Sequence, residues 1–358
     1  MNPGIPASEV RLALGKQKPA FMRAALFSVV IGVLMLAPSF YMLEVYDRVL
    51  NSRSVMTLAM LTLLLALVYV VLEVVQWARQ GVLREAAEGF DVALGGRVYE
   101  AVFLANLHGA RAIGQRSLRD FSTVRDFICG AVIAGIMDIP MALLLIGVIF
   151  YIDPVLGWFG LASALVQGVI TFFNKRSAQA PLAKANTLSS HARAFVESSL
   201  KNGEVARAMG MSEGLRQRWL SVQKDLLSHQ ALASDRAGVF TALSKYVQLV
   251  SSSLMLGLGA WLLLGGHFSG SEGLILMASI LAGRALAPLV QVIIGWRSVV
   301  DAREALARLE ELLTRVPAAV PGLPLPAPQG RLTLEHVAAR APGVGATGKL
   351  VLRNVSLE

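Results

Sequence analysis

Residues 55–77 read VMTLAMLTLLLALVYVVLEVVQW, and Glu73 is the only charged residue in the stretch. A helix rises about 1.5 Å per residue, so a run of this length crosses the roughly 30 Å hydrocarbon core of a membrane. Glu73 lies about 27 Å from Val55 on this scale, at the edge of the span, where a charge requires no functional role. Hydrophobic types make up 55% of the 358 residues and charged types only 16%, against about 25% charged in soluble domains. We therefore predict an all-α integral membrane protein.

Five further runs are long and apolar enough to span a membrane. Two of them carry one interior charge each, Asp138 in the third span and Arg284 in the sixth. The first run is too long for a signal-peptide core and has no evident cleavage site, so we interpret it as a helix preceded by a short N-terminal segment, residues 1–23. The predicted spans are residues 24–43, 55–77, 128–152, 155–174, 246–268 and 273–296.

The intervals between the spans alternate in length and in charge. Residues 78–127 and 175–240 carry seven and ten Lys or Arg residues, whereas the short intervals carry only Arg48 and Arg53. Cytoplasmic loops are enriched in Lys and Arg, so both long intervals and both termini are predicted to be cytoplasmic. The same bias explains the net charge of +9 without a nucleic acid partner, because the basic residues do not cluster with aromatic ones.

Both long intervals are predicted to be helices that continue beyond the membrane. Their apolar residues recur at helical spacing, which is typical of amphipathic helices. Glycine-containing breaks at residues 108–109 and 210–214 predict that each helical arm folds back on itself and leaves a short element at its tip.

The chain changes character after the sixth span. Residues 299–315 form a predicted amphipathic helix, and residues 316–330 are a proline-rich linker. Residues 331–337 alternate as a strand does, and residues 349–358 form a second strand-like run. About 28 residues cannot bury a core of their own, so we expect a soluble domain of which this chain contains only the start.

The sequence lacks the residue patterns that bind metals, form intrachain disulfides or hold phosphates. A single cysteine, Cys129, excludes an intrachain disulfide, and the five histidines lack metal-ligand spacing. No Gly-x-x-x-x-Gly-Lys-Ser/Thr loop is present to hold phosphates. We therefore predict no catalytic, cofactor-binding or metal-ligating residue in this chain.

Six sequence segments together resemble one known family: Leu36–Val49 (LAPSFYMLEVYDRV), Leu118–Phe127 (LRDFSTVRDF), Asp138–Pro140 (DIP), Glu204–Met211 (EVARAMGM), Gly257–Trp261 (GLGAW) and Gly283–Pro288 (GRALAP). The chain resembles the permease/ATPase of type I protein secretion systems, which is an ABC exporter, in the branch that exports proteases and lipases. The resemblance extends from about residue 24 to the end of the chain. It departs from the family at Ala341, where many ABC domains have an aromatic residue that stacks on adenine, and at Met141, where the family usually has tryptophan.

This resemblance implies a fold and a function. The expected fold is the six-helix transmembrane domain of a type I ABC exporter, residues 24–315, followed by the first strands of an α/β nucleotide-binding domain, residues 331–358. The expected protein is a homodimer in the bacterial inner membrane that uses ATP and Mg²⁺, neither of which this chain binds alone. Its partners would be membrane lipid, an unfolded secreted protein, a periplasmic adaptor and an outer-membrane channel. Two alternatives stay open: a peptide or lipid exporter, and a non-enzymatic membrane subunit that uses an ATPase in trans.

The resemblance also implies that the tips of the two arms dock onto the ATPase domains, within residues 118–124 and 202–211. The simpler interpretation of these segments is a solvated helix turn. The candidate coupling residues are Leu118, Arg119, Asp120, Phe121, Glu204, Val205, Arg207 and Met209.

Asp138 and Arg284 are predicted at similar depths inside the membrane, and a charge there usually faces protein or water. We hypothesise that they line an aqueous translocation path or pair with each other, within one chain or across a dimer. A purely structural salt bridge is the alternative. Prolines inside spans bend helices, so Pro38, Pro140 and Pro288 are candidate kinks that shape a cavity or serve packing.

Overall fold

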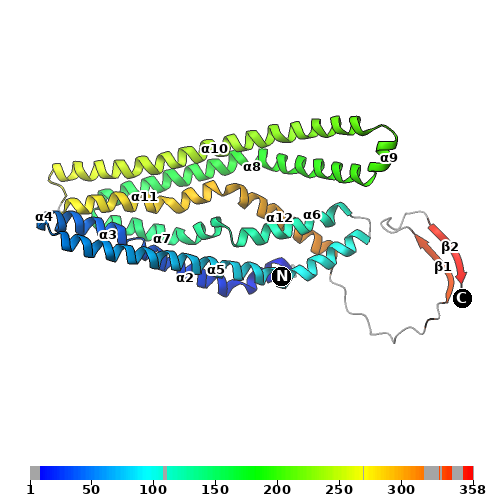
Figure 1. Ribbon diagram of the computed structural model, residues 1–358, viewed down its shortest axis with the longest axis horizontal. Coiled ribbons are helices and arrows are strands. Elements are labelled where there is room, and N and C mark those ends of the chain that lie inside the picture. Colours follow the sequence, from blue (N-terminus) through cyan, green and yellow to red (C-terminus); the bar gives the residue numbers. More distant parts are fainter. Residues whose placement is uncertain are drawn as a thin grey trace, which may run out of the picture. The chain divides into compact units, whose positions relative to one another are not determined.

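The computed structural model describes residues 9–107, 111–268, 270–317, 330, 333–340 and 350–357. These residues are mostly helical (Figure 1). The helices are α1 (Glu9–Lys16), α2 (Lys18–Leu34), α3 (Ala37–Glu44), the π-helical turn η1 (Val45–Val49), α4 (Leu50–Ser52), α5 (Val55–Leu107), α6 (Arg111–Ile128), α7 (Ala131–Ile152), α8 (Pro154–Lys201), α9 (Gly203–Ala208), α10 (Ser212–Leu264), α11 (Glu272–Ile294) and α12 (Trp296–Arg315). The strands are β1 (Leu334–Arg340) and β2 (Leu350–Leu357).

Within the described residues, 6 helical segments are long and apolar enough to cross a membrane, and each overlaps one predicted span. Helices α5, α8 and α10 contain 53, 48 and 53 residues, whereas a span needs only about 20. The predicted fold class, six spans with long helical extensions, is therefore confirmed. The predicted break at 108–109, residues 318–329 of the predicted linker and Ala341 lie outside the described residues.

The chain divides into two compact units. The large unit contains residues 19–85 and 129–300, and the small unit contains residues 1–18, 86–128 and 301–358. In the large unit, α10 packs on α8 and α11, and α11 also packs on α7 and α3.

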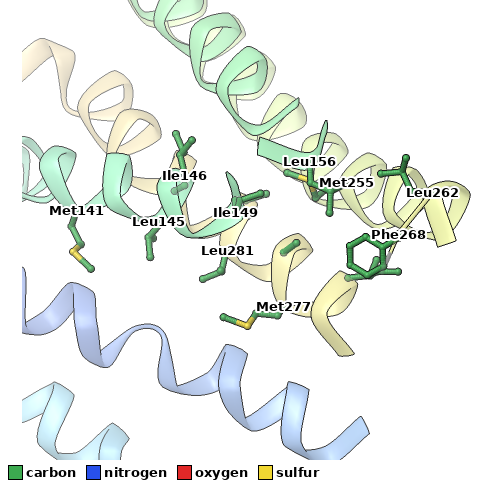
Figure 2. Close-up of a cluster of buried hydrophobic side chains, with 14 residues drawn as sticks. Met141, Leu145, Ile146, Ile149, Leu156, Met255, Leu262, Phe268, Met277 and Leu281 are labelled. Carbon is green, nitrogen blue, oxygen red and sulfur yellow. The ribbon is translucent and has the colours of Figure 1, made fainter. Parts of the chain in front are cut away.

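The core of the large unit is a cluster of buried apolar side chains from α7, α8, α10 and α11, shown in Figure 2. Ile149, Met255 and Leu281 are fully buried in it. Helices α10 and α11 approach closely at Gly259, where an added Cβ would collide with Cγ2 of Ile275. The core therefore depends on a residue without a side chain at this crossing.

Asp153 alone connects α7 with α8. Its carboxylate accepts hydrogen bonds from the backbone N–H groups of Val155 and Leu156, at 2.7 and 3.3 Å. Pro154 occupies the first turn of α8, where its missing N–H costs nothing. Local sequence thus explains how two spans are joined by so short a turn.

In the small unit, α12 buries the apolar stripe that the sequence predicted. Leu309, Leu312 and Leu313 are at most 5% exposed. Phe90 of α5 stacks on Phe121 of α6, with ring centroids 5.3 Å apart. These contacts give the small unit an apolar core of its own.

The three candidate kink prolines differ in their surroundings. A two-residue turn, Met35–Leu36, separates α2 from α3, and Pro38 is in the first turn of α3. Pro140 and Pro288 lie inside helices that continue past them, α7 and α11. Of the three, Pro38 therefore is the one that coincides with a break between helices.

Strands β1 and β2 pair antiparallel, and the register shifts along the ladder. His336 and Asn354 have positive φ angles of 49° and 55°, which are unusual for non-glycine residues and fit the irregular pairing. The first strand was predicted at residues 331–337, but β1 covers residues 334–340. Alternation alone did not locate the start of the strand.

Candidate functional site

A cavity of about 110 Å³ lies inside the large unit, between α2, α7 and α11. Most of its wall is apolar, and its charged side chains are Asp138 and Arg284. Ser28, Met35 and Gln291 also line it. The two charged residues that the sequence placed within the membrane therefore share one cavity.

Asp138 forms an ion pair with Arg79 of α5. The distance from Arg79 Nη1 to Asp138 Oδ1 is 2.6 Å, and the same nitrogen donates to Ser28 Oγ at 3.0 Å. The two side chains are only 12% and 26% exposed. Removing charges from water is expensive, so a pair this buried requires close geometry.

The hypothesis that Asp138 pairs with Arg284 within one chain is wrong in this structure, because the partner is Arg79. The sequence placed Arg79 in a basic interval just after the second span. Helix α5 continues through that point without a break and brings Arg79 to Asp138. The sequence signal for the partner of a buried acid is an arginine that lies close to the end of a neighbouring span.

Arg284 donates from Nη1 to the backbone carbonyl oxygen of Met35, at 2.9 Å. Among the described residues, Asp138 is the only acid on the cavity wall, and it is already paired with Arg79. Among the described residues, the charged groups on the cavity wall and their ion-pair partners are therefore two arginines, Arg79 and Arg284, and one carboxylate, Asp138. An excess positive charge remains at Arg284.

Uncharged polar contacts join the remaining helices of the large unit. Gln167 of α8 donates to the hydroxyl of Ser244 on α10, and both residues are fully buried. Ser252 of α10 and Ser279 of α11 exchange hydrogen bonds with each other's backbone carbonyls, at 2.9 and 2.7 Å. Such contacts support helix association where the surroundings are apolar.

The tip of the second arm is the short helix α9, as the sequence predicted. It is followed by Gly210, whose φ of 69° ends the helix in a left-handed conformation. All four candidate coupling residues of this arm lie on or directly after α9, and Val205 and Met209 are 59% and 68% exposed. A groove of about 260 Å³ runs beside α9 and is lined by both of these apolar residues.

The candidate coupling residues of the first arm do not behave alike. They lie within the continuous helix α6, and no separate tip element is present in the described part of this arm. Leu118 and Arg119 are exposed, whereas Asp120 and Phe121 are 4% and 8% exposed. Of these four residues, only Leu118 and Arg119 therefore have exposed side chains.

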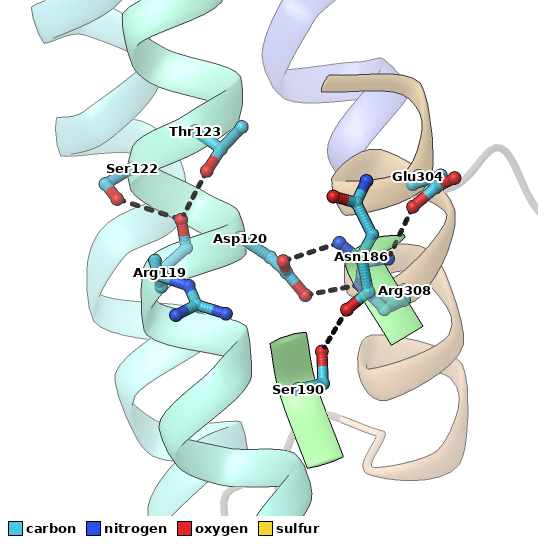
Figure 3. Close-up of polar contacts among 8 residues, drawn as sticks. All are labelled: Arg119, Asp120, Ser122, Thr123, Asn186, Ser190, Glu304 and Arg308. Atoms are coloured by element: carbon cyan, nitrogen blue, oxygen red, sulfur yellow. Dashed lines mark hydrogen bonds and ion pairs between the residues drawn. The ribbon is translucent and has the colours of Figure 1, made fainter. Parts of the chain in front are cut away.

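Asp120 is held by Arg308 of α12, as Figure 3 shows. Two hydrogen bonds join the groups, Arg308 Nε to Asp120 Oδ2 at 2.7 Å and Nη2 to Oδ1 at 2.8 Å. Hydrogen bonding to Asp120 raises the pKa of Arg308 above its usual value, so the guanidinium stays charged. Sequence reasoning missed this pair, because its members are 188 residues apart.

A second arginine of the small unit joins its N-terminal helix to the end of α12. Arg97 Nε donates to Glu9 Oε2 at 3.1 Å, and Arg97 Nη2 donates to the carbonyl of Val316. The Arg97 side chain is 13% exposed. The helix that leads toward the strands is thus tied to α1 and α5 as well as to α6.

Six helical segments in the described residues are long and apolar enough to cross a membrane, and three of these helices are much longer than a bilayer requires, as expected of a multi-pass membrane protein. Residues 21–284 match the family described as the ABC transporter transmembrane region, and the chain belongs to this family. The sequence is 36% identical over 345 residues to the type I secretion system ATP-binding protein PrsD of Rhizobium meliloti (strain 1021). The match covers 96% of this chain and 58% of PrsD.

More distant relatives agree with this assignment. The leukotoxin translocation ATP-binding protein LktB of Mannheimia haemolytica is 23% identical over 355 residues, covering 97% of this chain and 49% of LktB. A solved structure of a bacterial Atm1-family ABC exporter with ATP bound has the same fold, with a TM-score of 0.71 and 15% identity, and the match covers 95% of this chain and 61% of that one. The resemblance to type I secretion proteins is confirmed, and the chain spans about half the length of the curated relatives it matches.

Proposed function

We propose that this chain is the transmembrane half of an ATP-driven exporter in a type I protein secretion system. The observation that carries the proposal is the 36% identity to PrsD, a type I secretion protein, over 96% of the chain. The basic residues in the long intervals support a location in the bacterial inner membrane with both termini cytoplasmic. Two copies would assemble about twelve helices around the pathway.

The proposed cargo is an unfolded protein, such as a protease or lipase, with a secretion signal at its C-terminus. It would pass to a periplasmic adaptor and an outer-membrane channel. The family resemblance of the six segments supports this cargo class over a peptide or a lipid.

ATP and Mg²⁺ would act in nucleotide-binding domains that follow the linker. We propose that α9, with Glu204, Val205, Arg207 and Met209, docks on such a domain together with Leu118 and Arg119 of α6. The exposed apolar side chains of α9 and the groove beside it support this role. The 358-residue chain has no phosphate-binding loop, so on its own it should hydrolyse no ATP, and hydrolysis by a pure preparation would contradict this.

We further propose that Asp138 and Arg284 line the translocation path. Their shared cavity supports this. If Asp138→Asn and Arg284→Gln left export unchanged, singly and together, this role would be excluded.

A chimera tests the function. Residues 1–358 are joined to the remaining C-terminal part of PrsD and expressed in a strain that lacks PrsD, and secretion of a reporter with a type I C-terminal signal is measured. An ATPase-dead version of the chimera is the matched control. We expect secretion only from the active chimera. Lack of secretion by a chimera that reaches the membrane and hydrolyses ATP would contradict the proposal, and export of a peptide or lipid instead would support the alternative.

A further inference from the structure

The break between α2 and α3 leaves backbone carbonyls without their helical donors. Pro38 has no N–H, so the carbonyl of Leu34 loses its usual partner. The N–H of Ser39 would bond to Met35 in an unbroken helix, but it donates to the carbonyl of Leu36 at 2.9 Å. Phe40 donates to the same Leu36 carbonyl at 3.1 Å. In the described structure, the backbone N–H that would normally donate to the Met35 carbonyl therefore bonds elsewhere.

Arg284 supplies the missing donor from α11. Its Nη1 lies 2.9 Å from the Met35 oxygen, and the two residues are 249 positions apart in sequence. An unsatisfied carbonyl and an unneutralised guanidinium are both costly in an apolar interior. One contact between Arg284 and Met35 reduces both costs.

A second donor for the Met35 carbonyl is close by in sequence. Ser39 is fully buried, and its hydroxyl has no hydrogen-bond partner in the described structure. Serine hydroxyls in helices commonly donate to the carbonyl four residues earlier, and for Ser39 that residue is Met35. Rotation of one side chain would let Ser39 replace Arg284.

The two parts of the first span are held by different helices. Ser28, in α2, is bonded to Arg79, which is itself paired with Asp138 of α7. The break at Met35 is bonded to α11 through Arg284. Movement of α11 relative to α5 and α7 would therefore be concentrated at the break.

We propose that Arg284 is a positioning residue that holds the broken first span, and that the Met35 carbonyl changes donor from Arg284 to Ser39 when α11 moves away. The change of donor makes the break a hinge with two hydrogen-bonded states. Its use in a transport cycle rests on the function proposed above, but the hydrogen bond and its coupling to Pro38 do not.

Hydrogen exchange on the full 358-residue chain in lipid nanodiscs tests this proposal without ATP or cargo. Arg284→Met removes the donor and the charge but keeps a long apolar side chain. We expect exchange of the Ser39 and Phe40 amides to become about 3- to 20-fold faster, the range typical of polar contacts between membrane helices. Pro38→Ala restores the helical donors, so Arg284→Met should have almost no effect in that background.

Arg79→Met is the matched control, because it alters the same cavity from another helix without touching the break. Its effect on these amides should be the same in the native background and in the Pro38→Ala background. Adding Ser39→Ala to Arg284→Met should speed exchange further, because the second donor is then lost. Should Arg284→Met fail to fold, Arg284→Lys, which keeps a donor, should give a smaller increase that also disappears with Pro38→Ala. Equal effects of the Arg284 substitution in both backgrounds, or no effect at all, would overturn the proposal.

Discussion

Two arginine–aspartate pairs, one in each unit, tie together helices that are distant in sequence. The Asp120–Arg308 pair of the small unit has two hydrogen bonds, and the side chain of Arg308 is 30% exposed while that of Asp120 is 5% exposed. The Arg79–Asp138 pair of the large unit has a single contact, and there the arginine is the more buried partner. The residue that is left buried when its partner is removed is therefore the aspartate in the small unit and the arginine in the large unit.

The largest expected effect is that of Arg308→Ala. It leaves Asp120 buried without its cation, and breaking such a pair typically costs about 3–5 kcal/mol of unfolding free energy. Denaturant titration of the purified protein in mixed micelles measures this loss. A loss below about 1 kcal/mol would mean that Asp120 finds water or another donor.

Arg79→Met should rank second, with a loss of about 2–3 kcal/mol in the same titration, because Asp138 keeps some access to the cavity. The double variant Arg79→Met/Asp138→Leu removes both charges and should recover to within about 1 kcal/mol of the native protein. If the double variant were no more stable than Arg79→Met, the pair would contribute through packing rather than charge.

Asp120→Ala should cost less than Arg308→Ala, about 1–2 kcal/mol, although it removes the same hydrogen bonds. Arg308 remains partly exposed and keeps its contact with Glu304 at 3.4 Å. Comparing both variants in one titration isolates this asymmetry. Equal losses would show that burial of Asp120 does not set the cost.

The smallest effect is expected for Glu85→Gln in the large unit. Glu85 bonds to Arg23 at 3.0 Å, but the side chains are 60% and 53% exposed. Exposed pairs contribute little, so the unfolding free energy should change by less than about 0.5 kcal/mol. A larger loss would show that exposure does not make this pair contribute less to the unfolding free energy than the two buried pairs.

The features that the sequence predicted well depend on local patterns. The six spans follow from run length and composition, and the buried stripe of α12 follows from leucines at helical spacing. The short helix α9 follows from the glycines around it. Pro38 coincides with a break between helices, whereas α7 and α11 continue past Pro140 and Pro288, so a proline alone does not predict where a span breaks.

The features that were missed depend on tertiary contacts. The partner of Asp138 was missed because the predicted continuation of the second span as a helix does not reveal which neighbouring helix Arg79 faces. Asp120 and Phe121 were grouped with exposed docking residues, but α12 and α5 cover them. Phe121, Val124 and Ile128 recur at helical spacing and mark the covered face of α6, but no pattern within α6 reveals that Arg308 pairs with Asp120.

The one-residue connection at Asp153 has a consequence for biosynthesis. The single residue between α7 and α8 leaves no slack between the two segments. We expect them to enter the bilayer together as a helical hairpin. The two amide hydrogen bonds that cap α8 also satisfy the Asp153 carboxylate at the turn, so one side chain both starts a helix and closes the connection.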